Sequence, residues 1–401
     1  MSRLGGLLIE DRIQLVPGFS WFGKNIGIKD DSLDFGGILA DRPCDAAGVF
    51  TRNTMPGAPI LVGREHLEDG QLQAVIVNSK NANVATGLQG VEDSRRICRL
   101  VSESCGIRPD LVLPSSTGVI GRRLPIEVIS RACSGVKDDF GKTEGHVANF
   151  ARSIMTTDTR RKLISAKVGS VTLLGIAKGA GMIEPNMATM LCYFVTDARI
   201  SSTLLQPMLQ RVANKSFNRV SVDTDTSTSD TVVILANGLA GAVDPDPFEG
   251  ALSEMAIYLA REIARDGEGA TKLIELTVSG AHTGEQALLT AKSIINSPLV
   301  KTAIYGADPN WGRFVMAVGK VFDYPVDIGD LRLFFGQGEN RFKIDAETLD
   351  RDEVPLTQIS ETLKGNEVYI EVVVGNGPFS EKVWGCDLTE GYIDINARYT
   401  T

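Results

Sequence analysis

The stretch KGAGMIEPNMATML (178–191) lies between two apolar runs, residues 171–177 and residues 190–195. The first run predicts a strand that enters a glycine-rich turn, and the second predicts a strand that leaves it. Thr189 follows Ala188 directly before the second run. A threonine hydroxyl there can attack the preceding carbonyl, and hydrolysis of the resulting ester frees an α-amine that acts as base for the same hydroxyl. The alternative is a strand–turn–strand with an ordinary threonine.

Composition sets broad limits on the function. The 401 residues are enough for a large core and predict two domains. The net charge of −9, without a Lys/Arg stripe to offset it, argues against a nucleic-acid partner. No apolar run reaches 18 residues, and residues 1–14 do not resemble a signal peptide. We therefore expect a cytoplasmic protein with no membrane partner.

Cysteine and histidine spacing gives no metal motif. The six cysteines contain no C-x-x-C pair, and His66, His146 and His282 lie far apart. We expect no metal site, and reduced cysteines of which several lie in the core.

Strand-like and helix-like segments alternate along the chain. Strands are predicted at 35–39, 47–50, 58–62, 72–77, 111–114, 219–223, 231–235, 273–278, 331–335, 341–344, 367–374 and 392–399. Helical spacing marks residues 91–105, 203–217, 248–265, 284–296 and 314–321. This alternation predicts an α/β or α+β layered fold with mixed sheets. We place a nucleophile-bearing domain at 1–280 and a smaller C-terminal α/β domain at 281–401.

Polar residues that follow predicted strands are the site candidates. Ser116-Thr117-Gly118 could supply a hydroxyl and a backbone N–H to an oxyanion hole, because glycine lets the backbone approach a ligand closely. Lys178 at a strand end and Glu268 between two glycines could hold a polar substrate. Taken singly, each of these charges is more often a solvated surface group.

Other nucleotide-binding and hydrolase motifs do not fit the chain. Gly179-Ala-Gly181 lacks the third glycine of a dinucleotide fingerprint, and Pro185 stands where its helix would run. Neither a G-x-x-x-x-G-K-[ST] loop nor a G-x-S-x-G elbow occurs in the sequence.

KGAGMIEPNMATML resembles the cleavage-site motif of the bifunctional glutamate N-acetyltransferase/ornithine acetyltransferase family of arginine biosynthesis. Further blocks are similar to that family in the same order, and together they span nearly the whole chain. They are AAGVFTRN (46–53), SSTGVIG (115–121), IMTTDT (154–159), VDTDTSTSDT (222–231), DPNWGR (308–313) and the C-terminal CDLT…INARYTT.

The resemblance implies self-cleavage between Ala188 and Thr189 into an α chain (1–188) and a β chain (189–401). It implies that Thr189 is the nucleophile, which takes an acetyl group from N-acetylornithine and passes it to glutamate in a ping-pong cycle. Thr117 and Gly118 match the oxyanion positions. The substrate-binding positions match Thr156, Lys178, Thr189, Glu268, Asn396 and Thr401.

The resemblance also implies an architecture and a set of partners. The implied fold is an α/β sandwich with sheets layered between helices and a smaller C-terminal domain, assembled as an α2β2 heterotetramer. No cofactor is implied, and acetyl-CoA stays open as a second acetyl donor. The other partners are small molecules.

Several positions depart from the family pattern. Lys80 and Thr224 stand where glycine is usual, Ser229 where asparagine is usual, and Trp21-Phe22 where smaller residues are usual. If position 80 needs a positive φ, lysine there costs about 1 kcal/mol. These changes leave the acyl acceptor open.

Two other functions stay open from the sequence. One is a self-processing amidase or aminopeptidase, in which water accepts the acyl group. The other is an uncleaved binding protein that keeps the fold.

Overall fold

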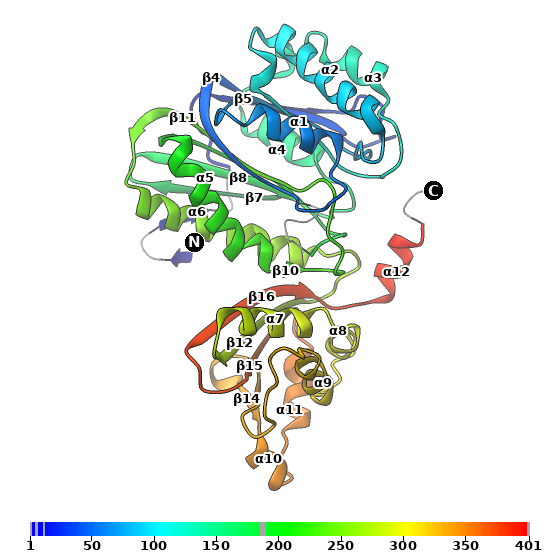
Figure 1. Cartoon of the computed structure of the whole chain (residues 1–401), viewed down its shortest axis with the longest axis vertical. Helices are drawn as coiled ribbons and strands as arrows, with labels where there is room; N and C mark the ends of the chain where they lie inside the picture. The colour runs from blue at the N-terminus through cyan, green and yellow to red at the C-terminus, as the bar shows by residue number, and fades with distance from the viewer. Residues whose placement is uncertain (1, 5–6, 11–12, 185–189, 399–401) are drawn as a thin grey trace. The chain divides into compact units, whose positions relative to one another are not determined.

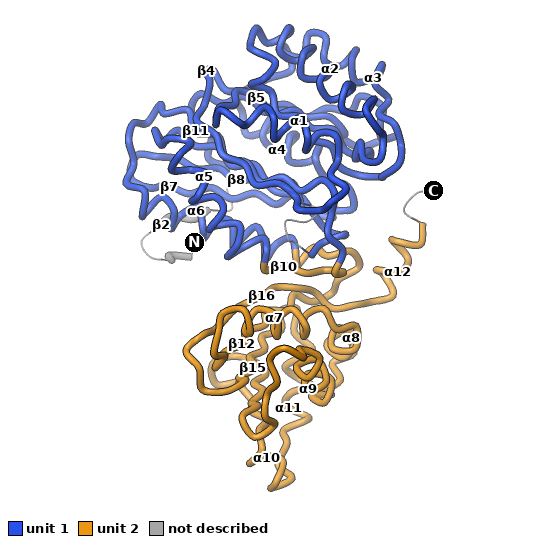
Figure 2. Tube along the Cα trace, in the orientation of Figure 1, with its two compact units in different colours: residues 1–218, 225–263 blue, residues 219–224, 264–401 orange. Residues whose placement is uncertain are grey.

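The computed structural model describes residues 2–4, 7–10, 13–184 and 190–398, and these residues divide into two compact units (Figure 2). Unit 1 comprises residues 1–218 and 225–263, and unit 2 comprises residues 219–224 and 264–401. The boundary between the two units therefore lies at 263/264 rather than at the predicted 280/281. The reason is that residues 273–281 form a strand of the second unit's sheet.

Ten strands of the described part of unit 1 form a mixed sheet. Its order is β1-β2-β7-β8-β9-β11-β4-β5-β6, with β3 paired to β4. The bounds are β1 Ser2–Leu4, β2 Leu7–Glu10, β3 Phe19–Lys24, β4 Phe35–Phe50, β5 Gln71–Asn78, β6 Val112–Ser116, β7 Lys162–Val168, β8 Val171–Lys178, β9 Leu191–Arg199 and β11 Thr231–Ala242.

The long strand β4 joins the two halves of this sheet. Residues 35–39 pair with β5, residues 45–50 pair with β11, and the β5 register shifts between Leu39 and Cys44. The predicted strands at 35–39 and 47–50 are thus parts of one strand, because the exposed residues 41–43 stay extended instead of forming a turn.

A hydrophobic core fills the space between the two halves. Ile38 and Val75 from one half join Ile176, Tyr193 and Val233 from the other in one buried cluster. The alternate residues of β5 turn the other way, towards helices, as the two-residue period of a strand requires.

Helices cover both faces of unit 1 (Figure 1). Their bounds are α1 Ala58–His66, α2 Gly87–Cys105, α3 Ile126–Cys133, α4 Glu144–Ser153, α5 Ser202–Lys215 and α6 Pro245–Arg265. Short 3-10 helices lie at Pro109–Leu111, Val136–Asp139 and Phe217–Arg219. The resulting order of helices, two sheet layers and helices confirms the predicted α/β sandwich.

The strand predicted at 58–62 is wrong, because these residues begin helix α1. Pro59 occupies one of the first two helical positions, where its missing N–H costs nothing. Ala58, Ile60 and Val62 are buried. A short run of apolar residues does not by itself distinguish a buried helix from a strand.

Unit 2 contains a six-stranded sheet, with order β10-β16-β12-β15-β13-β14 among the described residues. The strands are β10 Val220–Ser221, β12 Leu273–Ala281, β13 Arg332–Phe335, β14 Phe342–Ile344, β15 Glu367–Val373 and β16 Phe379–Cys386. The helices are α7 Gly284–Ile295, α8 Pro298–Tyr305, α9 Gly312–Gly319, α10 Ala346–Asp350, α11 Leu356–Leu363 and α12 Glu390–Asn396, with a 3-10 helix at Gly338–Asn340.

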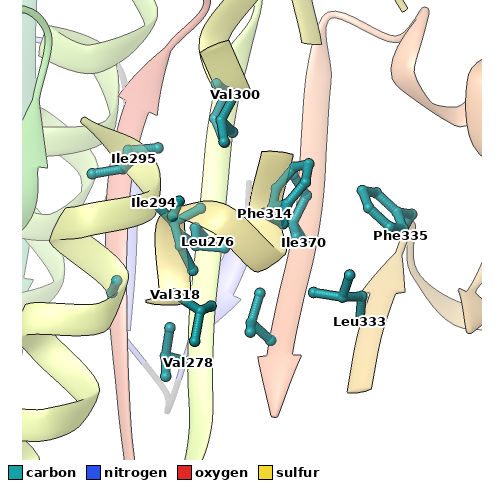
Figure 3. Packing of buried hydrophobic residues seen from close by; sticks show 14 of the residues in the cluster. Leu276, Val278, Ile294, Ile295, Val300, Phe314, Val318, Leu333, Phe335 and Ile370 are labelled. Atoms are coloured by element: carbon teal, nitrogen blue, oxygen red, sulfur yellow. The ribbon is translucent and has the colours of Figure 1, made fainter. Parts of the chain in front are cut away.

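The core of unit 2 lies between this sheet and its helices (Figure 3). Leu276 and Val278 of β12 and Ile294 of α7 belong to this buried cluster. The Phe314 ring of α9 meets the Phe335 ring of β13 edge-on, with ring centroids 5.3 Å apart. The smaller C-terminal unit therefore has its own hydrophobic core.

The strand predicted at 392–399 is wrong over its described residues, because residues 390–396 form helix α12. Thr389 caps this helix by accepting a hydrogen bond from Gly391 N–H. The alternating Ile393 and Ile395 predicted a strand, but the cap and Glu390 in the first turn favour a helix.

All six cysteines are free and buried, which confirms the prediction of free core cysteines. Burial raises the pKa of the Cys44 thiol to about 12. Among the described residues, no helix is long and apolar enough to cross a membrane. The same residues contain no group of three or more His, Cys, Asp or Glu side chains that could hold a metal ion.

Candidate functional site

Lys178, at the end of β8, connects two of the predicted site residues of unit 1. Its Nζ donates to Thr117 Oγ1 at 3.1 Å and to Thr156 Oγ1 at 2.9 Å. Thr117 follows β6 and Thr156 follows α4, so three separate segments of the chain meet at one ammonium group. Lys178 is only 2% exposed, which contradicts a solvated surface charge and fits a group held for a ligand.

Gly118 occupies a position that only glycine can fill. Its φ is +132°, and an added Cβ would lie 2.2 Å from the carbonyl carbon of Lys80. Thr117 N–H donates to Asn78 O and Val119 N–H donates to Lys80 O, which fixes the backbone on both sides. Within the described part of the chain, the N–H of Gly118 itself donates to no group. A fixed, uncommitted N–H beside a threonine hydroxyl is the arrangement that an oxyanion hole requires.

The buried carboxylate of Asp158 accepts hydrogen bonds from several groups of this site. Its Oδ1 accepts from Lys162 Nζ at 2.7 Å and from Gly179 N–H at 2.6 Å, and its Oδ2 accepts from Thr156 N–H at 3.0 Å. Burial alone would raise the pKa of Asp158, but the ammonium groups of Lys162 and Lys178 outweigh burial and hold the pKa well below its usual range. Asp158 thus stays charged and fixes both Thr156 and the turn after Lys178.

Asp230 holds the start of β9. Its Oδ1 accepts from Met190 N–H at 3.1 Å, and Thr231 N–H donates to Met190 O at 3.1 Å. Burial raises the pKa of Asp230 well above its usual range, against the lowering effect of the Met190 hydrogen bond. Leu191 pairs with Lys178 on β8 and with Thr231 on β11. The residue that follows position 189 in sequence is therefore held on both its N–H and its carbonyl.

Three predicted residues lie outside the described residues: Ala188 and Thr189 at the predicted cleavage site, and Thr401 at the C-terminus. Their predicted roles stay predictions.

Unit 2 carries the other two predicted substrate-binding residues, Glu268 and Asn396. Asn396 Nδ2, at the end of α12, donates to Glu268 Oε2 at 2.8 Å. Glu268 is 8% exposed, and Gly269 beside it has φ +69° with the backbone of Gly391 against it. The structure therefore brings these two residues together, as the resemblance implies for a shared binding role.

Three residues that depart from the family pattern have a defined backbone conformation or burial in the structure. Lys80 has φ +75° and Thr224 has φ +70°, so both stand in a conformation that favours glycine. Position 80 therefore meets the condition under which lysine costs about 1 kcal/mol. Ser229 is buried.

Sequence reasoning missed Asp158, Lys162 and Asp230 as parts of the site. Asp158 lies inside the IMTTDT block and Asp230 inside the VDTDTSTSDT block, so both were within motifs already singled out. Asp158 and Lys162 lie outside any helix, so their four-residue spacing was not a signal of pairing. Both of these side chains are 0% exposed.

The chemistry of unit 1's site follows from these groups. One buried ammonium and two hydroxyls can bind a carboxylate, and the Gly118 N–H can stabilise a developing oxyanion. Such groups suit acyl transfer.

Comparisons of the sequence with known proteins identify its family. The ArgJ family profile matches residues 20–401. An arginine biosynthesis bifunctional protein, ArgJ 2, from Clostridium acetobutylicum is 48% identical over 96% of this chain and 98% of its own length. Glutamate N-acetyltransferase Oat2 from Streptomyces clavuligerus is 45% identical, again over 96% of this chain and 98% of its own. A crystal structure of ornithine acetyltransferase complexed with ornithine, from Mycobacterium tuberculosis, covers 45% of this chain and 98% of its own at 34% identity and a TM-score of 0.43. With a match that spans nearly its whole length, this chain belongs to the ArgJ family.

Proposed function

We propose that this protein is an acetyltransferase that moves the acetyl group of N-acetylornithine to glutamate, in arginine biosynthesis. The names of relatives at 45–48% identity over 96% of the chain support this assignment. The observation that carries it is the position of Lys178 Nζ between Thr117 Oγ1 and Thr156 Oγ1. This arrangement places a carboxylate-binding cation beside the candidate oxyanion hole.

Thr189 acts as the nucleophile in the proposed reaction. Its hydroxyl attacks the acetyl carbonyl of N-acetylornithine, and its own α-amine takes the proton and delivers it to the leaving amine. The amide C–N bond breaks, ornithine leaves, and the acetyl group remains as an ester on Thr189. The amine of glutamate then attacks this ester and releases the threonine hydroxyl.

Thr117 and Gly118 stabilise the two tetrahedral intermediates. Each intermediate carries a negative oxygen, which accepts hydrogen bonds from the Thr117 hydroxyl and the Gly118 N–H. The uncommitted N–H of Gly118 within the described chain supports this role. Because the loop is fixed by backbone bonds to Asn78 and Lys80, little reorganisation is needed during the reaction.

The remaining predicted residues bind and orient the substrates. Lys178 binds the α-carboxylate that both amino acids share, and Thr156 orients it. Glu268 binds a substrate ammonium, and Asn396 positions the Glu268 carboxylate through their 2.8 Å hydrogen bond. Thr401 contributes to the same binding function.

Self-cleavage between Ala188 and Thr189 must precede catalysis in this proposal, because the α-amine of Thr189 is otherwise part of a peptide bond. Denaturing mass analysis should give two fragments of about 19–24 kDa, at roughly 110 Da per residue, and none at the 43.1 kDa of the whole chain. Two fragments of each kind form an α2β2 assembly, whose native mass should be about twice that of one chain.

An acetyl-transfer assay tests the function directly. The purified protein is given N-acetylornithine labelled in the acetyl group, with glutamate or one of several other amino acids as acceptor. Labelled N-acetylglutamate supports the proposal. Labelled acetate alone, in the presence of glutamate, would assign the chain to the hydrolases instead. Repeating the assay with acetyl-CoA as donor decides whether the chain uses that second donor.

A further inference from the structure

Unit 1 contains a cavity of about 1210 Å³ that reaches Thr156 and Asp158 of the site. Its wall carries charges of both signs. The charged residues besides Asp158 and Lys29 are Arg152, Arg160, Arg161, Asp31, Glu144 and Glu262. Of these, Arg160 and Glu262 form an ion pair at 3.6 Å. The cavity can therefore receive either a cationic or an anionic group next to Thr156.

Lys29, on the connection between β3 and β4, is the lysine that lines this cavity. Its Nζ donates to Met155 O at 2.6 Å and to Leu33 O at 3.0 Å. These are its two side-chain hydrogen bonds within the described chain, and an ammonium has three N–H donors. One donor therefore remains for a ligand in the cavity.

The backbone around Lys29 is fixed, and two carbonyls hold its ammonium, so the ammonium does not have to be ordered when a ligand binds. The fully buried Asp34 carboxylate accepts from the N–H groups of Ile26, Ile28 and Lys29 at 2.7–2.8 Å. A preorganised donor binds a ligand with a smaller entropy loss than a mobile surface lysine.

Two lysines thus flank the segment Met155–Thr156. Lys178 bonds to the Thr156 hydroxyl, and Lys29 bonds to the Met155 carbonyl. An amino acid with a single carboxylate needs one such cation. Glutamate carries a second carboxylate at the end of its side chain, whereas ornithine carries an ammonium there.

We propose that Lys29 binds the side-chain carboxylate of the acetyl acceptor and thereby selects a dicarboxylic amino acid for the second half of the reaction. This inference rests on the proposed function.

The ionisation of Lys29 should make the KM for glutamate depend on pH. Burial lowers its pKa to about 8, with Asp34 and Asp158 acting to raise it and Lys178 and Lys80 acting to lower it. Below pH 8 the ammonium is present, and a bound carboxylate stabilises it. As the pH rises through about 8 the ammonium is lost, so the KM for glutamate should rise there.

The test compares Lys29→Met with Lys29→Arg. Two quantities are measured for each variant: the release of ornithine from N-acetylornithine in a single turnover, and the KM for glutamate across pH 7 to 9. Lys142→Met is the matched control, because Lys142 is an exposed lysine of unit 1 whose partner is Asp41.

Lys29→Met should raise the KM for glutamate roughly 10- to 100-fold, the range for losing one hydrogen bond to a charged group, and leave ornithine release within about 3-fold of wild type. Lys29→Arg should restore a low KM and remove its rise above pH 8, because arginine stays charged. An unchanged KM in Lys29→Met, with transfer intact, would overturn the proposal for Lys29 alone. Equal losses in both half-reactions would also overturn it, since they indicate a structural role. No ornithine release from the wild-type protein would instead remove the proposed function itself.

Discussion

Lys178 Nζ lies 3.1 Å from Thr117 Oγ1, although the two residues come from different halves of the folded sheet of unit 1. The contact joins the residue predicted to bind a carboxylate to the residue predicted to stabilise the oxyanion. Because Lys178 also contacts Thr156, changes at any of these three positions should affect substrate binding and the chemical step together.

Lys178→Met should lower kcat/KM for acetyl transfer roughly 30- to 100-fold, which corresponds to the loss of a charge-assisted hydrogen bond of about 2–3 kcal/mol. The apolar, unbranched side chain of methionine is one atom shorter than that of lysine and fits a buried position. Lys167→Met on the exposed face of β7 is the matched control and should leave kcat/KM nearly unchanged. Steady-state kinetics with N-acetylornithine as donor make the comparison, and equal activity of the two variants would contradict the role of Lys178.

Gly118→Ala should reduce activity far more than Gly121→Ala, although both glycines lie in the same loop and both have positive φ. A Cβ at position 118 meets the Lys80 carbonyl carbon at 2.2 Å, whereas a Cβ at position 121 meets nothing within 4 Å. Gly121→Ala should therefore cost only the conformational penalty of about 1 kcal/mol. Kinetic assays beside urea unfolding of both variants separate lost activity from lost stability. Similar activities of the two variants would argue against an oxyanion role for this backbone.

Replacing Lys80 or Thr224 by glycine should stabilise the protein by about 1 kcal/mol each, because both residues have φ near +70°. The contact of Lys80 with Asp30, at 3.9 Å between exposed side chains, adds little to offset this gain. Lys320→Gly is the control, since Lys320 has φ −76° and gains nothing from glycine. Urea unfolding curves measure all three variants. Stabilisation of Lys320→Gly to the same extent would show that the effect does not come from φ.

Asp158→Asn should lower the free energy of unfolding by about 3–5 kcal/mol at neutral pH, because it leaves the buried Lys162 ammonium without its counter-charge. The depressed pKa of Asp158 means that its contribution is fully present above the unfolded carboxyl pKa of about 3.9 and is lost as the pH falls below that value. The difference between wild type and variant should therefore shrink in acid. A double variant, Asp158→Leu with Lys162→Met, should be more stable than Asp158→Asn, since it removes the Lys162 ammonium together with its counter-charge. A difference that stays constant from pH 7 to about pH 3 would contradict the ion-pair explanation.

The sequence predicted the parts of the fold that depend on local pattern. Strand β5 and helix α6 follow from continuous apolar runs and helical spacing. Residues 58–62 and the described residues 392–398 were mispredicted as strands because their apolar residues also suit short helices, and caps and packing decided between the two. The two-layer arrangement depends on the course of β4, in which residues 41–43 stay extended although their composition is typical of a turn.

Site residues could be predicted where a sequence motif includes them. They were harder to predict where their role depends on partners distant in sequence. Thr117, Thr156 and Lys178 were identified from three blocks, and the structure brings them into contact. Asp158 and Asp230 were within quoted blocks, but their importance depends on burial and on bonds to Gly179 and Met190. Such long-range pairing is not visible in a single sequence.

In the proposed reaction, Thr189 carries the acetyl group between donor and acceptor. Mass analysis of the protein mixed with N-acetylornithine, quenched before glutamate is added, tests it directly. The account predicts a gain of about 42 Da, one acetyl group, on the fragment that begins at Thr189, and loss of that mass when glutamate is added. Two results would contradict this role of Thr189. One is an uncleaved chain that still transfers acetyl groups. The other is acetyl transfer without an acetylated fragment, together with an active Thr189→Ala variant.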